Sequence, residues 1–195
     1  MSDDGGYAVV ADPYCYAGTA VLKNIPGLRD QATVEGFETA ITTQRAQEPL
    51  PSGRFSVSHY RAIHRHLFQD VYRWAGRFRT VRIAKEESMF CYPEHIAGEM
   101  RRLFGELRDG NYLRDLDAGP FSAGLAHFVA ELNAIHPFRD GNGRTQLIFA
   151  TVLAQRAGNP LVLKRLRPRR FLLAMIRSFH GDEGPLREEI SRLIA

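Results

Sequence analysis

The sequence predicts an all-α protein that carries one short β-hairpin, and three observations support this fold class. Apolar residues recur along most of the chain with the spacing of amphipathic helices. Residues 77–92 alternate instead with a period of two, which is typical of strands. The length of 195 residues suits one domain with a substantial core. We therefore expect an N-terminal extension with one helix over residues 1–50, packed on a core over residues 51–195.

The first two helices are predicted from their start and stop signals. One is expected over residues 31–47, ended before Pro49 and Pro51. The next begins near Ser56, and its apolar face is formed by Val57, Tyr60, Ile63, Leu67, Phe68 and Val71. Three histidines on this helix lack the pairing with an acid that zinc sites show, so we expect structural or solvated roles for them: His59, His64 and His66.

A β-hairpin is expected between the second and third helices. Arg79, Val81 and Ile83 alternate with three other residues, which favours a short strand. Residues 85–88 then form a turn, and residues 89–92 return as the second strand. Because Pro93 can open a helix, the chain is expected to be helical again over residues 94–108.

Residues 131–147 join two further helices and hold most of the chemically active side chains. The upstream helix begins near Pro120, and one of its faces is apolar: Leu125, Phe128, Val129, Leu132 and Ile135. It ends at His136, because a residue before a proline disfavours the α conformation. The downstream helix is expected from Arg144 to Ala157. After a basic loop over residues 164–170, two more helices complete the bundle, the last of them running to Ala195.

The loop between these two helices suits a phosphate ligand. Gly141 and Gly143 lack a Cβ, so an anion can approach their backbone N–H groups closely. Arg144 can form a forked pair with phosphate oxygens. Asp140 is a hard oxygen ligand for a magnesium ion, and His136 can remove a proton from a hydroxyl group. In isolation, Gly-Asn-Gly would equally indicate a simple turn.

The whole string His-Pro-Phe-Arg-Asp-Gly-Asn-Gly-Arg, residues 136–144, resembles the signature of the Fic family (filamentation induced by cAMP). Residues 12–30 resemble, more loosely, the N-terminal segment of Fic proteins of the toxin–antitoxin and secreted-effector types. Residues 72–77 also resemble a recurrent stretch of the family. The resemblance implies a Fic-type helical bundle that transfers AMP from ATP to a hydroxyl side chain of a target protein.

The resemblance also implies a role for each matched position. His136 would be the general base, Asp140 would bind Mg²⁺, and Arg144 would hold the triphosphate. The attacking hydroxyl would displace pyrophosphate from the α-phosphorus of ATP, with catalysis resting on positioning and charge stabilisation. Four matched residues complete the loop, three as an anion hole and the phenylalanine as a plug in the core: Gly141, Asn142, Gly143 and Phe138.

One position departs from the family pattern. The pattern continues with a second arginine, and this chain has Leu147 there. Residues 144 and 147 share a helix face, so the site has one cation fewer beside Arg144. A lost charge-assisted hydrogen bond is worth roughly 1.5–3 kcal/mol, or about one to two powers of ten in affinity. We therefore expect weakened triphosphate binding in an enzyme that is still active.

The expected hairpin matches the position of the family's flap, which holds the target segment by strand addition. The alternative is a hairpin that only covers the core. The resemblance favours the flap, with Met89 and Phe90 as its target-binding residues. Lys85 and Glu86, at the tip, are candidates for contacts with the nucleotide.

Composition limits the partners and the location of the protein. The net charge is +4, but no nucleic-acid motif accompanies the basic loop at residues 164–170, so a nucleic-acid partner is disfavoured. The start of the chain lacks a signal-peptide pattern, and no apolar run approaches the length of a membrane span. We expect a cytoplasmic protein, or delivery to a host cell if the chain is an effector. Cys15 and Cys91 suggest no disulfide framework.

Regulation by a separate small antitoxin is expected. Fic proteins are commonly inhibited by a helix that bears Ser/Thr-x-x-x-Glu-Gly/Asn. Glu35-Gly36 and Glu183-Gly184 have Gln31 and Phe179 at the hydroxyl position, so neither fits.

Two alternatives to adenylyl transfer stay open at this point. One is another nucleotidyl or phosphoryl transfer on the same scaffold, although the related Doc kinases carry a lysine where this chain has Gly143. The other is a binding module whose nucleotide site is impaired by Leu147.

Overall fold

Seven α-helices, two 3₁₀ helices and one pair of two-residue strands make up the described part of the chain, residues 12–85 and 88–195, in this computed structural model. The all-α fold class with one short hairpin is therefore observed. The α-helices are α1 (Gln31–Gln47), α2 (Val57–Phe68), α3 (Pro93–Asp109), α4 (Ala118–Ile135), α5 (Asn142–Ala157), α6 (Pro168–Phe179) and α7 (Gly184–Leu193). The short elements are β1 (Ala84–Lys85), β2 (Ser88–Met89), η1 (Asn111–Leu113) and η2 (Leu163–Arg165).

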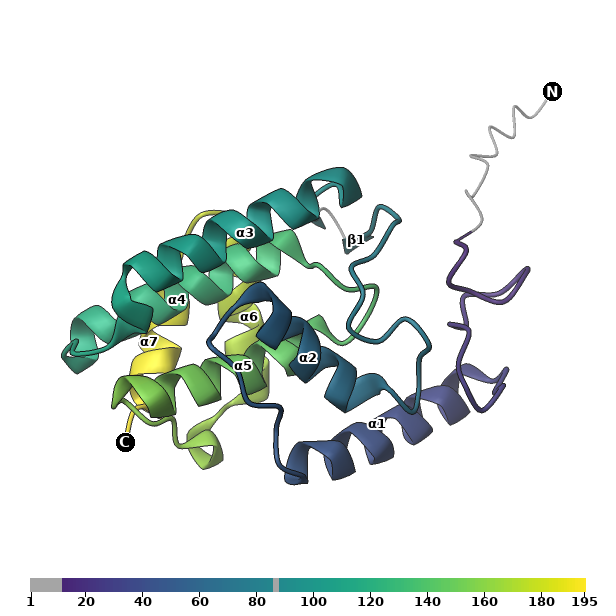
Figure 1. Cartoon of the computed structure of the whole chain (residues 1–195), viewed down its shortest axis with the longest axis horizontal. Helices are drawn as coiled ribbons and strands as arrows, with labels where there is room; N and C mark the ends of the chain where they lie inside the picture. The colour runs from purple at the N-terminus through teal and green to yellow at the C-terminus, as the bar shows by residue number, and fades with distance from the viewer. Residues whose placement is uncertain (1–11, 86–87) are drawn as a thin grey trace.

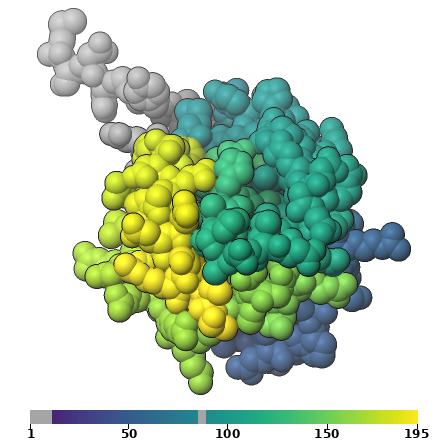
Figure 2. All heavy atoms as spheres, turned by 90° about the vertical axis from the view of Figure 1, so that its left-hand side faces the viewer, coloured from purple at the N-terminus to yellow at the C-terminus, as the bar shows by residue number. Residues whose placement is uncertain are grey.

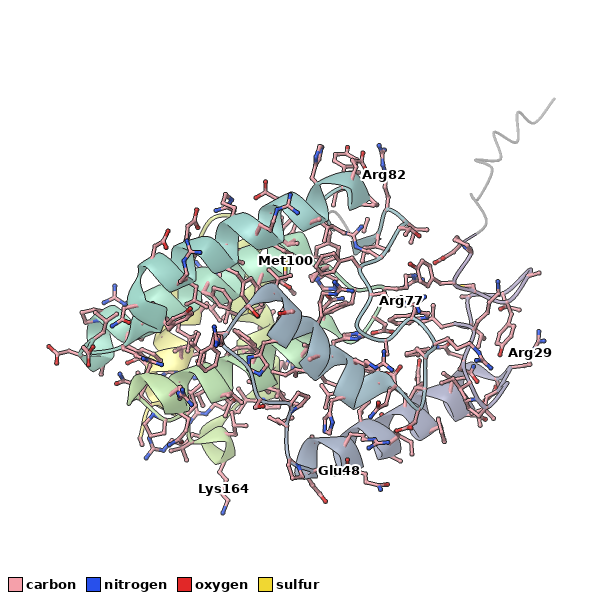
Figure 3. The ribbon with its side chains drawn as sticks, in the orientation of Figure 1. Arg29, Glu48, Arg77, Arg82, Met100 and Lys164 are labelled. Carbon is pink, nitrogen blue, oxygen red and sulfur yellow. The ribbon has the colours of Figure 1, made fainter. Side chains whose placement is uncertain are left out.

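Helix α4 is the centre of the bundle. Helices α3, α5, α6 and α7 all pack against it, and α2 packs on α3 and α5 (Figure 1). The five residues of its predicted apolar face are buried: Leu125, Phe128, Val129, Leu132 and Ile135. Met100 points from α3 toward this interior, whereas Arg82 and Lys164 project outward (Figure 3).

Helices α1 and α2 begin where the sequence predicts. The Asp30 side chain accepts the N–H of Thr33 at 2.8 Å, and Ser56 accepts the N–H of His59 at 3.3 Å, so both N-termini are capped. Helix α1 packs on α2 through a buried face formed by Val34, Glu38 and Thr42. Two of these three residues are polar, which is unusual for a face directed at the core.

The hairpin is shorter than expected and is confined to the middle of the predicted span. The predicted strands over residues 79–84 and 89–92 are replaced by β1 and β2, in which Ala84 pairs with Met89 in antiparallel register. Arg79 is not in a strand: its backbone N–H donates to the carbonyl of Pro137 at 2.9 Å, and its side chain is buried. Glu86 and Glu87, at the predicted tip, lie outside the described residues.

The C-terminal helices close the bundle on the side opposite α2. Figure 2 shows the yellow residues of the C-terminus beside teal residues, and α6 and α7 both pack on α4. The last helix was expected to reach Ala195 but ends at Leu193, since Ile194 is extended and pairs with Leu161 in an isolated β-bridge. Within the described residues, no helix combines the length and the apolar character that crossing a membrane requires.

Candidate active site

Residues 136–144, here called the signature loop, border a cavity of about 880 Å³ between α4, α5 and α6. Helix α4 ends and α5 begins at this cavity, so both helix ends are directed at the same space. Seven of the predicted site residues line it: Phe90, His136, Asp140, Gly141, Asn142, Gly143 and Arg144. Its far wall is apolar and comes from α6, with Phe171, Met175 and Phe179 among its residues.

His136 caps α4 in a left-handed backbone conformation, with φ 46° and ψ 62°. This conformation is uncommon for a residue with a side chain, and it turns the chain sharply at Pro137. The ring stacks on Phe90 at 3.9 Å between centroids, and Nδ1 lies 3.3 Å from the Asn133 carbonyl. A carbonyl can only accept, so Nδ1 carries the hydrogen in that contact, and in the neutral ring the lone pair is then on Nε2. The ring is therefore suited to accept a proton at Nε2.

Arg79 stabilises this turn by hydrogen bonds to its backbone, a role that the sequence analysis missed. Its side chain is 2% exposed, and its guanidinium donates to backbone carbonyls instead of to a carboxylate. Nε reaches the carbonyl of His136 at 2.8 Å, and Nη2 reaches those of Ile135 at 3.2 Å and Cys91 at 2.5 Å. Nη1 donates to the carbonyl of Val81 at 2.7 Å. Arg79 thus ties the end of α4 to both sides of the hairpin.

The two loop glycines differ in what surrounds them. Gly141 has φ 77°, and a Cβ there would lie 2.3 Å from the Phe68 ring, so glycine is required by the packing of the loop. A Cβ on Gly143 would meet nothing within 4 Å, so the space beside it is open to a ligand. The first intrahelical bond of α5 runs from Thr145 to Gly141, which leaves the preceding N–H groups of the first turn for an anion.

Asn142 and Phe138 give the loop its shape. The Asn142 side chain is buried; its Oδ1 accepts the Phe138 N–H at 3.0 Å and its Nδ2 donates to the Phe138 carbonyl at 2.9 Å. Its side chain therefore closes the loop, and only its backbone N–H remains suited to an anion hole. Phe138 is fully buried and its ring contacts those of Tyr60 and His64.

Asp140 suits a metal site in which the phosphates of a bound nucleotide supply further ligands. Its carboxylate is 46% exposed, lines the cavity, and accepts the Gly141 N–H at 2.5 Å. Within residues 12–85 and 88–195, no group of three or more acidic, His or Cys side chains could enclose a metal ion. Magnesium commonly takes one or two carboxylates and completes its shell with phosphate oxygens and water, so a single Asp140 suffices for that type of site.

Arg144 is held at the cavity by residues of two other helices. Its Nη2 pairs with the carboxylate of Glu38, and its Nη1 donates to Thr42 Oγ1 at 3.2 Å, both on α1. Its guanidinium carbon lies 4.7 Å from the centroid of the Phe68 ring of α2. Leu147, one helical turn further, is half-buried and lines the same cavity.

His64 is a second residue whose position the sequence analysis did not find. It is fully buried, and its Nδ1 accepts the N–H of Gly76 at 2.9 Å. Its Nε2 therefore carries the hydrogen and donates to the Asp140 carbonyl at 3.0 Å. Burial lowers the pKa of His64 from 6.5 to about 4; the hydrogen bond to Asp140 raises it, and the charge of Arg144 lowers it.

This shift predicts a loss of stability in mild acid. Because the pKa of His64 is lower in the folded chain, the unfolded state binds the extra proton between about pH 6.5 and pH 4. The stabilisation is complete above pH 6.5 and is lost as the pH falls toward 4, at up to about 1.4 kcal/mol per pH unit. Urea unfolding at pH 7.5 and pH 5 should show a smaller pH dependence in His64→Gln than in the wild type. Equal pH dependence in the two chains would contradict the prediction.

The hairpin residues divide between the cavity and the surface. Met89 is 59% exposed at the end of β2, where a target segment could contact it. Phe90 is buried instead, stacked on His136 and packed edge-on against Phe179, so it supports the histidine ring and does not lie on an exposed edge. Glu86 and the side chain of Lys85 lie outside the described residues, so their nucleotide contacts stay predictions.

Comparison with known proteins identifies relatives along the whole chain. The model of the Fic/DOC family matches residues 54–154. A Sinorhizobium fredii protein described as probable protein adenylyltransferase y4lH is 52% identical over 96% of this chain and 98% of its own length. The Escherichia coli probable protein adenylyltransferase Fic is 34% identical over 100% and 97%. Protein adenylyltransferase VbhT of Bartonella schoenbuchensis is 38% identical over 93% of this chain and 38% of its own length.

Solved structures agree with the fold. The N-terminal Fic domain of a Bartonella quintana effector, which contains bound ADP, superimposes with a TM-score of 0.85 at 28% identity, over 93% of this chain and 94% of that one. BepC of Bartonella tribocorum, with bound AMPPNP, gives 0.84 at 26% identity, over 93% and 96%.

Proposed function

Because this chain belongs to the Fic/DOC family, we infer that it is a protein adenylyltransferase, which transfers AMP from ATP to a hydroxyl side chain of a target protein. The observation that carries this function is the complete loop over residues 136–144, set at the junction of α4 and α5 around one cavity. It supplies a base, a carboxylate, open backbone N–H groups and a guanidinium within nine positions. ADP and AMPPNP in the related Bartonella structures support a nucleotide as the ligand of this cavity.

We propose that His136 is the general base of the transfer. The serine, threonine or tyrosine oxygen of the target attacks the α-phosphorus of ATP, and its proton passes to Nε2 of His136. The new O–P bond forms as the bond between the α-phosphorus and the bridging oxygen breaks, and pyrophosphate leaves with the bond's electrons. The contact of Nδ1 with the Asn133 carbonyl supports this assignment, because it orients the ring and sets the tautomer.

The negative charge of the phosphates would be stabilised by the signature loop and the N-terminus of α5. The backbone at Gly143 borders space that a ligand can enter, and Gly143 and Arg144 both line the cavity at the positive end of the α5 helix dipole. Asp140 would hold Mg²⁺, which when bound neutralises phosphate oxygens and helps to orient them. Asp140 keeps its orientation through the Gly141 N–H and the His64 contact to its backbone.

The test is label transfer with two forms of ATP. The chain is incubated with Mg²⁺ and a cell lysate, and with ATP labelled at either the α- or the γ-phosphate. We expect a protein band labelled from the α position only. Label from the γ position only would contradict adenylyl transfer and indicate a kinase, and absence of label from both would indicate another donor or a binding module.

Leu147 is expected to limit the affinity for ATP. We predict that Leu147→Arg lowers the dissociation constant of MgATP by about 10- to 100-fold, because the new guanidinium adds a charge-assisted hydrogen bond beside Arg144. Isothermal titration calorimetry with ATP and ADP measures the change, with Leu147→Met as the control of similar volume. An unchanged dissociation constant for ATP in Leu147→Arg would show that residue 147 does not reach the phosphates.

We also propose that a separate small protein controls the enzyme. Support comes from the sequence, because neither of the two Glu-Gly pairs in the chain fits the inhibitory pattern of the family. Affinity purification of the chain from its own cells should recover a short partner that carries this pattern. Recovery of the chain alone, with full activity, would contradict the proposal.

A further inference from the structure

Helix α1 contacts Arg144, a residue that lines the cavity, although α1 lies outside residues 54–154, the part that matches the family model. The carboxylate of Glu38 is paired with Nη2 of Arg144 through its Oε1. Thr42, one turn further along α1, accepts from Nη1 of Arg144 at 3.2 Å and donates to the Glu38 carbonyl at 2.7 Å. Two residues of one helix therefore hold both terminal nitrogens of the guanidinium.

Glu38 is itself fixed by Tyr72, whose hydroxyl donates to Oε2 of the carboxylate. Burial raises the pKa of the Tyr72 phenol, and its hydrogen bond with Glu38 raises this pKa further. The phenol is therefore a permanent donor at physiological pH. With one oxygen bound to Tyr72 and the other to Arg144, the carboxylate has a defined orientation.

Glu38 lies behind the guanidinium as seen from the cavity. Arg144 is among the described residues that line the cavity, and Glu38 is not. The Glu38 side chain is 10% exposed, against 38% for Arg144, so a ligand reaches the guanidinium more readily than the carboxylate. On its other side the guanidinium rests over the Phe68 ring. This arrangement indicates that Glu38 orients Arg144 and does not compete with a phosphate for it.

We propose that Glu38 is a positioning residue for adenylyl transfer, which holds Arg144 ready to bind the phosphates of the nucleotide. The inference rests on the proposed function, in which Arg144 contacts those phosphates. A long side chain that is ordered before the ligand arrives has already lost its rotamer freedom, so less affinity is lost on binding. If Glu38 instead competed with the phosphates for Arg144, its removal would tighten nucleotide binding.

The first measurement is the affinity of the full chain for MgATP, by isothermal titration calorimetry. Glu38→Ala should raise the dissociation constant about tenfold, and Glu38→Gln less, because the amide keeps the shape and can still accept a hydrogen bond. At saturating ATP, kcat should change less than about threefold, since Glu38 does not touch the reacting atoms. Glu35→Gln is the matched control: it makes the same change on the exposed side of α1 and should leave the affinity unchanged.

A double-mutant cycle separates positioning from general stability. In an Arg144→Ala background, Glu38→Ala should change the dissociation constant less than about twofold, because the residue through which Glu38 acts is absent. A full tenfold effect in that background, or tighter binding in Glu38→Ala alone, would overturn the proposal. If the wild type transfers AMP and Glu38→Ala has the same KM for ATP, the role of Glu38 is contradicted and the proposed function is not. Binding that depends on Glu38, without AMP transfer by the wild type, would contradict only the proposed function.

Discussion

Replacing His136 by Ala should lower the rate of AMP transfer by roughly 10²–10⁴-fold, the range that general bases contribute. The imidazole is the proposed proton acceptor, and alanine leaves the target hydroxyl to lose its proton to water. Nucleotide affinity should change much less, because the proposed phosphate contacts come from the start of α5 and from Arg144. Initial rates of transfer from α-labelled ATP to the lysate proteins, at saturating ATP, measure the effect on kcat.

The control for this variant lies on the same helix. His127 is exposed on α4, where it contacts Glu183, and His127→Ala should transfer AMP at the wild-type rate. Thermal unfolding of both variants shows whether the fold is retained, since the ring of His136 also stacks on Phe90. A His136→Ala chain that is folded, binds ATP and transfers AMP within about threefold of the wild type would falsify the assignment of the base.

Replacing Arg79 by Met should lower the free energy of unfolding by roughly 3–5 kcal/mol. Methionine fills most of the volume but leaves four backbone carbonyls without the donor that now satisfies them. Because two of these carbonyls end α4, the turn at His136 should loosen and AMP transfer should fall as well. Urea unfolding monitored by circular dichroism measures the stability, and label transfer measures the activity.

Two further variants interpret the result. Arg77→Met makes the same change at an exposed arginine two residues away and should shift the unfolding free energy by less than about 0.5 kcal/mol. Arg79→Lys keeps the charge but has a compact donor in place of the planar fork, so its stability should fall between wild type and Arg79→Met. An Arg79→Met chain as stable as Arg77→Met would mean that water replaces the guanidinium at little cost.

The elements that follow from local signals could be predicted from the sequence. The apolar period of α4, the Asp30 and Ser56 caps, and the left-handed Gly158 that ends α5 act within a few residues of themselves. The signature loop could also be predicted from the sequence, because nine neighbouring residues carry its chemistry. The predicted strands over residues 79–84 and 89–92 were wrong in extent. Alternation alone does not distinguish a paired strand from an extended segment held by a buried side chain.

The supporting residues could not be predicted because their partners are distant and are mostly backbone atoms. Arg79 donates to a carbonyl 57 positions away, and any residue type supplies such an acceptor. Glu38 reaches Arg144 across 106 positions. One local signal existed: Glu38 and Thr42 continue the buried face that Val34 begins. A charged residue at a core position of a helix requires a partner, even when the sequence does not reveal which one.

The N-terminal segment and the signature loop should be treated as one inherited unit. Asp12 pairs with Arg139 of the loop at 2.7 Å, as Glu38 pairs with Arg144, so two ion pairs cross the point where the family match begins. A chimera that joins the first 53 residues of one relative to the remainder of another would combine halves of these pairs that have not been selected together. Substitutions at such contacting sites are not independent in their effects. Crossovers between relatives that keep both partners of each ion pair from one parent are therefore expected to be tolerated. Crossovers that fall between residues 38 and 139 separate the partners and are expected to be tolerated poorly.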